Sequence, residues 1–306
     1  MHPAFSVIFF TTASGAGYGL WIWLGLLAAG NALPARAPSL FALGLGFVCV
    51  TAGLLSSTLH LGQPQRAWRA FSQWRSSWLS REGVVALLCF VPMVWLGAAL
   101  WFGYHARLAG LALALLSLLT VACTAMIYAS LKPVPAWRHP LVVPVYLLFA
   151  LFTGGLLLAA ILSLAGLAPG NMTGFAAMIV AVLLWRLKRY AWRSIDQGEL
   201  PVSRASALGL PAGRSIKVFE RPHTEGNYLT REMGFVLARK HARKLRVIAV
   251  LLFALVPALC ALPVWLFVHL DAAPWFLAAA LSALAGTFVE RWLFFAEAKH
   301  LVTLYY

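Results

Sequence analysis

Long apolar runs separated by polar breaks organise this chain. A helix of about 20 mostly apolar residues is long enough to cross the hydrocarbon core of a bilayer. The pattern predicts eight such spans, at residues 6–29, 40–59, 83–103, 107–129, 142–166, 172–189, 246–269 and 274–296. The predicted fold class is therefore all-α: a polytopic membrane protein in which 1–306 form a single eight-transmembrane-helix bundle.

The longest polar break, 190–245, is predicted to be a basic excursion from the bundle. Residues 196–227 are rich in Gly, Pro and Ser, which is typical of irregular structure. Residues 228–246 place apolar side chains along one helical face and crowd Lys and Arg at the end, which predicts an interfacial basic helix leading into the seventh span. Two roles remain open for this helix, anchoring to lipid headgroups and docking of a soluble partner.

The composition excludes an ordinary soluble domain. The chain is 62% hydrophobic and 11% charged, whereas soluble domains carry about 25% charged residues. The formal net charge is +15, but the basic residues stand in the breaks between apolar runs. We therefore interpret them as determinants of membrane orientation and of contact with anionic lipid, and we expect no nucleic-acid partner.

The distribution of basic residues between loops predicts the orientation. The break from His60 to Glu82 carries four Lys or Arg, the break from Lys132 to Pro140 two, and the connection from Arg186 to Arg246 fourteen. The alternate loops carry one, one, none and none. Because short loops rich in Lys and Arg stay in the cytoplasm, both termini are predicted to be cytoplasmic.

The cysteines and histidines argue against a metal or haem in this chain. Each of the four cysteines lies in a different apolar run, whereas iron–sulfur and zinc sites need several thiolates close together. The eight histidines all lie in loops, at helix ends or in tails, so no pair at mid-membrane depth is available to ligate a haem. The chain is therefore expected to contain no metal and no haem.

A glycine-rich string lies inside the first span. Gly15, Gly17 and Gly19 resemble a nucleotide-binding loop in composition, but no strand precedes them, as such a loop requires. Small residues in a span let helices approach closely, and they also leave room for a flat ring. Both interpretations remain open from the sequence.

The segment HLGQPQRAWRAFSQWRSSWLSRE, from His60 to Glu82, is the most informative stretch. His60 closes the second span and Glu82 opens the third, so both are predicted at the cytoplasmic edge of the hydrocarbon. One interpretation is structural: a glutamate at a helix start, favoured by the helix dipole, with Arg81 as its counter-ion. The other is functional. Reduction of a quinone needs a hydrogen-bond donor and proton exchange, and His and Glu provide both.

Further ionisable and hydroxyl groups lie in the first and last spans. Glu290 and Glu297 share one face of the last span, and charged residues inside a span are costly enough to suggest a function. A structural Glu290–Arg291 ion pair and a proton path through Glu82, Glu290 and Glu297 are both compatible with the sequence. Thr11 and Ser14 are predicted at the same membrane face and are candidate quinone-binding groups.

At this point the chain resembles a known family. The stretches MHPAFSVIFFTTASGAGYG, STLHLGQPQRAWRAFSQWRSSWLSRE and ERWLFFAEAKHLVTLYY are similar to the membrane anchor subunit of the dimethyl sulfoxide reductase family. The resemblance covers essentially the whole chain, and only the 196–245 excursion departs from shorter anchors. The long form looks especially like the anchor of cytoplasmic sulfite-oxidising (sulfite:quinone) complexes.

The resemblance implies a function and a set of residues. It implies an eight-helix subunit that binds ubiquinone or menaquinone and docks an iron–sulfur subunit, which connects it to a molybdopterin catalytic subunit. His60 and Glu82 match the family's quinol site, and Gly62 and Arg66 also match. Arg66 and Arg81 would orient the carboxylate and help hold the partner. Alone, the chain is expected to be non-catalytic.

Three alternatives stay open at this stage. One is a menaquinol-oxidising anchor of a dimethyl sulfoxide reductase-type complex. A secondary transporter would usually show inverted repeats and helices broken near the midplane, and no clear repeat is visible in this sequence. A purely structural anchor would need no His and Glu at a shared depth.

Overall fold

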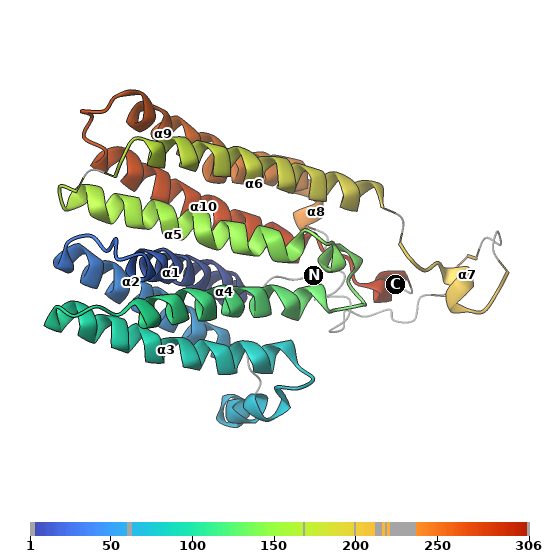
Figure 1. The fold of residues 1–306 in the computed structure, drawn as a ribbon. Helices are drawn as coiled ribbons and strands as arrows, with labels where there is room; N and C mark the ends of the chain where they lie inside the picture. The colour runs from blue at the N-terminus through green and yellow to red at the C-terminus, as the bar shows by residue number, and fades with distance from the viewer. Residues whose placement is uncertain are drawn as a thin grey trace.

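The computed structural model describes residues 4–59, 63–167, 169–198, 200–211, 216–217, 219–220 and 237–304, without the side chains of Pro64 and 237–240. These residues form long helices packed side by side in one bundle (Figure 1). The long helices are α1 (Phe5–Ala29), α2 (Arg36–Thr58), α3 (Trp78–Phe102), α4 (Arg107–Ala129), α5 (Val142–Leu164), α6 (Met172–Gln197), α8 (Leu237–Val250), α9 (Val256–Leu266) and α10 (Ala273–Ala296).

Shorter elements gather at one end of the bundle. They are the 3-10 helices η1 (Pro64–Gln73), η2 (Pro135–Arg138) and η5 (Leu301–Leu304), and the four-residue helix α7 (Arg204–Ala207). Both chain termini lie at this same end (Figure 1). The protein is thus all-helical over the described residues, as the sequence predicted.

Seven helices in the described part of the chain are long and apolar enough to cross a membrane: α1 to α5, the continuous stretch His241–Leu266, and α10. The predicted span 172–189 does form a helix, α6, but three charges (Arg186, Lys188 and Arg189) lie within the last four residues of that span. The predicted count of eight spans is therefore not confirmed by length and composition.

The third helix begins earlier than predicted, and this changes the position of Glu82. The sequence placed Glu82 at the first turn of a span that starts at residue 83, but α3 begins at Trp78 and has no acidic residue in its first turn. The η1 helix and a short turn lead directly into it. Favourable contact with the dipole falls off within the first turn, so helix capping does not explain this carboxylate.

Glycines bring α1 into contact with its neighbours, which bury most of this helix. A Cβ added to Gly19 would overlap the carbonyl oxygen of Ala150 in α5, and one added to Gly17 would stand 2.9 Å from the carbonyl oxygen of Gly46 in α2. The packing interpretation is therefore confirmed for these two positions. Gly15 has nothing within 4 Å of such a Cβ.

The Gly19→Ala variant is expected to disrupt the bundle, because the added methyl group meets the α5 backbone, which cannot move without shifting the helix. The loss should be about 3 kcal/mol or more. The yield of monodisperse protein in mild detergent measures it. Gly44→Ala in α2 is the matched control, since nothing lies within 4 Å of its added Cβ. Equal yields for the two variants would show that the α1–α5 crossing is not close.

The seventh span contains a π-helical turn, η4 (Leu251–Leu255), between α8 and α9. Val256 N–H donates to Leu251 O, which leaves Leu252 O without its usual helical donor. Ser282 of α10 donates its hydroxyl to this carbonyl at 2.8 Å. In a bilayer a carbonyl has no water to bond, so a neighbouring serine is a common replacement. The predicted basic helix at 228–246 lies partly outside the described residues; from residue 237 it is helical.

Candidate functional site

A groove of about 720 Å³ opens beside η1, between α1, α2, α3, α4 and the C-terminal part of α10. We call it the lipid-side groove. Its walls are mostly apolar and include Val7, Phe10, Leu54, Phe71, Ala86, Ile127, Tyr128, Trp137 and Phe295. Leu79 and Leu87 line it and are also more than half exposed, so the groove opens on the outer surface of the bundle.

The Glu82 carboxylate is the acidic group of this groove. Its residue is only 4% exposed. The Thr124 hydroxyl of α4 donates a hydrogen bond to Glu82 Oε1, and α3 and α4 pack along each other, which brings the two side chains together. A carboxylate in an apolar wall is costly, because it loses the hydration it would have in water. Such a group is suited to binding or exchanging a proton.

Two hydrogen-bond donors line the groove near η1. Arg66 contributes a guanidinium and Gln63 an amide, and both residues are exposed. The groove therefore combines an apolar body with a carboxylate, a guanidinium and an amide. Small-molecule and cofactor sites commonly have this composition, and their volumes are about 300–1,000 Å³.

His60 and Gly62 lie outside the described residues. Of the described residues nearest to them, Thr58 and Gln63 line the lipid-side groove, whereas Leu59 is exposed and does not line it. Arg81 is directed away from the carboxylate: its guanidinium donates to the carbonyl oxygens of Trp74 and Arg75 at 2.9 and 2.6 Å. The group also stacks on the Trp78 ring, 4.3 Å from its centroid. In the described part of the chain, the partner of Glu82 is Thr124 rather than the predicted Arg81.

Thr11 and Ser14 line a different cavity. Each hydroxyl donates to a carbonyl of its own helix, Thr11 to Val7 at 3.0 Å and Ser14 to Phe10 at 2.6 Å. Both residues are buried and line a small space of about 10 Å³, which we call the inner cavity. Thr124 lines this cavity too. The two predicted quinone-binding groups therefore line the inner cavity and not the lipid-side groove.

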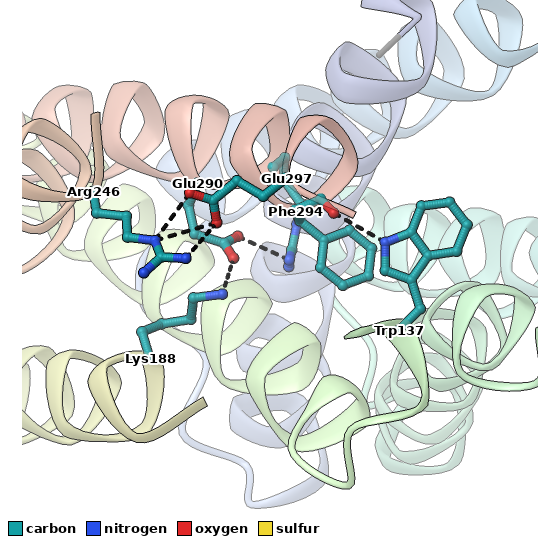
Figure 2. A network of polar contacts seen from close by, with 7 residues as sticks. Trp137, Lys188, Arg246, Glu290, Phe294 and Glu297 are labelled. Carbon is teal, nitrogen blue, oxygen red and sulfur yellow. Dashed lines mark hydrogen bonds and ion pairs between the residues drawn. The ribbon is translucent and has the colours of Figure 1, made fainter. Parts of the chain in front are cut away.

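A buried charge cluster joins α6 and α10 (Figure 2). Lys188 Nζ lies 2.5 Å from Glu290 Oε1, and Arg291 Nη1 lies 3.0 Å from Glu290 Oε2. The Arg291 guanidinium also stacks on Tyr146 at 3.5 Å from the ring centroid. The predicted Glu290–Arg291 pair is confirmed. The contact of Lys188 was not predicted, because the sequence counted it only among the basic residues of the connection from Arg186 to Arg246, at the end of the predicted span 172–189.

Glu297 belongs to a second ion cluster nearer the end of the bundle. Arg246 Nε donates to Glu297 Oε1 at 2.9 Å, and Arg246 Nη1 lies 2.5 Å from Asp196 Oδ2 (Figure 2 shows the Glu297 contact). Burial raises the pKa of Glu297, and the Arg246 contact opposes this rise. Glu290 and Glu297 therefore bind different cations, although they lie on one helix face.

The described residues contain no group of three or more His, Cys, Asp or Glu placed to hold a metal ion. The four cysteines are free thiols. Cys89, for example, lies 3.4 Å from the Thr120 hydroxyl.

Comparison with known proteins identifies a family. The family profile of the DMSO reductase anchor subunit (DmsC) matches residues 1–296. The chain is also 33% identical over 333 aligned positions to a sulfite dehydrogenase subunit of Allochromatium vinosum, covering 100% of this chain and 99% of the relative. The chain belongs to the DMSO reductase anchor subunit family and is a multi-pass membrane anchor of an oxidoreductase complex.

Proposed function

We propose that this anchor binds a membrane quinone in the lipid-side groove and exchanges its electrons with a partner iron–sulfur subunit. The single observation that carries the proposal is the position of Glu82: a nearly buried carboxylate in the wall of a mostly apolar groove that opens on the outer surface of the bundle. A flat ring with a long apolar tail suits this shape, and ubiquinone and menaquinone both have that form.

The groups of the groove fit a quinone chemically. A bound quinone supplies two-electron, two-proton chemistry. Arg66 and Gln63 are positioned to donate hydrogen bonds to a carbonyl oxygen, and Glu82 is positioned to hold or release a proton at its carboxylate oxygens. The apolar walls exclude water and leave the tail in contact with lipid. His60, with Gly62 beside it, is proposed as a further donor, on the basis of its match to the family.

The orientation and the partners are part of the same proposal. Both termini lie at one end of the bundle (Figure 1), which requires an even number of crossings. We infer that α6 also crosses the membrane and brings the number of spans to eight, with the charges of its second half buried against α10 or placed at the membrane edge. The basic loops then place the groove at the cytoplasmic face of a bacterial inner membrane. The iron–sulfur subunit and its molybdopterin partner would dock there, on the same side as the groove.

The substrate of the complex is proposed to be sulfite. The support is the sulfite dehydrogenase subunit of Allochromatium vinosum, which matches this chain over its full length. A cytoplasmic groove also suits a catalytic subunit that is not exported. The anchor of a dimethyl sulfoxide reductase-type complex is the alternative. Turnover of the intact complex with sulfite and with dimethyl sulfoxide, assayed separately, distinguishes the two.

Filling the groove tests the quinone site. In the Ala70→Trp variant an indole would occupy the groove from η1, so quinone-coupled turnover should fall about tenfold or more while the complex still assembles. Gln65→Trp adds the same bulk to η1 at an exposed residue outside the groove, and it should keep normal turnover. Purification in gentle detergent should recover iron, molybdenum and quinone with the unchanged chain. A chain recovered alone would favour a transporter, and equal turnover of the two variants would remove the groove from the mechanism.

A further inference from the structure

Four spaces lie in series across the cytoplasmic end of the bundle, and each is joined to the next by shared or hydrogen-bonded side chains. Thr124 bonds Glu82 of the lipid-side groove and lines the inner cavity. Tyr146 and Arg291 line the inner cavity and also a second small space of about 30 Å³, which we call the bridging cavity. His139 lines the bridging cavity and an outer cavity of about 460 Å³.

The inner cavity is polar and has unused hydrogen-bonding capacity. The hydroxyls of Thr12, Tyr18 and Tyr146 and the Nε of Arg291 are buried there without a hydrogen-bond partner among the described residues. Each buried polar group of this kind costs free energy unless it is bonded. A space of about 10 Å³ with two to four polar neighbours is sufficient for one water molecule. The chemistry of the lining therefore indicates water here.

The bridging cavity is bordered by fixed charges. Lys188, Glu290 and Arg291 all line it, and Glu290 is fully buried between the two cations. Buried charges hold water strongly, because no apolar contact replaces their hydration. The three charged groups of the cluster would order water in this cavity.

His139 connects the bridging cavity with the outer cavity. Burial lowers the pKa of His139, and the nearby Lys188 adds to this effect. At neutral pH the imidazole is therefore mainly neutral and able to accept a proton. The outer cavity is bordered by Asp196, Glu297 and Lys299, and the Asp196 side chain is 54% exposed. Protons from bulk water reach this end of the series directly.

We propose that these spaces form a lateral proton path from the cytoplasmic surface at His139, through Tyr146 and Thr124, to Glu82. This proposal rests on the proposed quinone site. A ring bound in the groove would fill the space beside Glu82 and exclude water from it, so its proton needs a route that does not pass the ring. The inner cavity, behind Thr124, provides one on the opposite side of the carboxylate.

The path moves protons only. During uptake, His139 passes one proton inward and regains one from the outer cavity. Each water or hydroxyl along the path accepts one proton and releases another, and Glu82 gains the last. The electrons travel separately, between the quinone and the partner's iron–sulfur cluster. Release of a proton from Glu82 is the reverse sequence.

The double variant Tyr18→Phe/Tyr146→Phe tests the path in the intact complex. It removes two hydroxyls and keeps both rings, including the ring that Arg291 covers. We expect kcat for quinone-coupled turnover to fall about tenfold or more, with KM for quinone unchanged within about twofold. Tyr104→Phe is the matched control, since Tyr104 is exposed beyond the far end of α3. It should behave as the unchanged protein does.

A second readout does not depend on turnover. A high-resolution cryo-electron microscopy map of the complex should show ordered water in the inner and bridging cavities. In the double variant, the water of the inner cavity should be lost. Dry cavities in the unchanged complex, or an unchanged kcat in the double variant, would overturn the path. If Glu82→Gln abolishes turnover while the double variant does not, only the path fails. An unchanged complex that cannot use quinone at all overturns both proposals.

Discussion

Replacing Glu82 by Gln should abolish quinone-coupled turnover while the complex still assembles. Glutamine keeps the shape of the side chain and can still bond the Thr124 hydroxyl, so α3 and α4 should pack as before. It cannot carry a proton at that position. General acid–base groups typically contribute about 10²–10⁴-fold to a rate, and a loss of this size is expected in kcat.

The measurement is electron transfer from the catalytic subunit's substrate to a soluble quinone analogue, in purified complex. A direct artificial electron acceptor should still be reduced at the normal rate, because it bypasses the anchor. Glu220→Gln makes the same chemical change at an exposed residue of the excursion and should have no effect. Normal quinone turnover in Glu82→Gln would remove this carboxylate from the mechanism.

Replacing Glu290 by Gln should destabilise the bundle more than any surface substitution. The carboxylate neutralises two buried cations, Lys188 at 2.5 Å and Arg291 at 3.0 Å. Without it, both cations remain buried with no anion in contact. Breaking a buried ion pair by removing one partner costs about 3–5 kcal/mol. The midpoint of thermal unfolding in detergent should therefore fall clearly, and the yield of the complex with it.

The double variant Glu290→Gln/Lys188→Met separates charge from packing. The double variant returns the net charge of the cluster to +1, the value in the unchanged protein. It also replaces the lysine with an apolar side chain of similar length. The physical expectation is recovery of most of the lost stability, since only Arg291 then stays charged, beside the introduced amide and the Tyr146 ring. A single variant as stable as the unchanged protein would show that these cations reach water.

Much of the architecture follows from the sequence. Apolar runs long enough to cross a bilayer, and loops that alternate between basic and neutral, determine the class of protein and the order of its helices. The starts and ends of helices are set by contacts beyond the apolar run, which is why α3 begins at Trp78 rather than at residue 83. Whether α6 crosses the membrane was equally hard to predict. Its charged residues suggest contact with water, but Lys188 is buried in the bundle.

The site shows the same division. Glu82, Glu290 and the resemblance around residues 60–82 were visible in the sequence, because charged groups beside apolar runs are unusual. Thr124 and Tyr146 carried no such signal, since threonine and tyrosine are ordinary residues of membrane helices. Lys188 was visible as a charge, but its burial was not. Only the packing of α6 against α10 brings it to Glu290.

Membrane location, the residues that are costly there, and the family resemblance all follow from the linear chain. Hydropathy and charge are properties of consecutive residues, so they can be calculated from the sequence without knowledge of the fold. Which polar groups meet depends instead on the three-dimensional packing: Glu82 with Thr124, Glu290 with Lys188 and Arg291, and Arg246 with Asp196 and Glu297. Most of these contacts join helices far apart in the sequence. They depend on helix rotation and on close approaches such as that at Gly19, which no local pattern records.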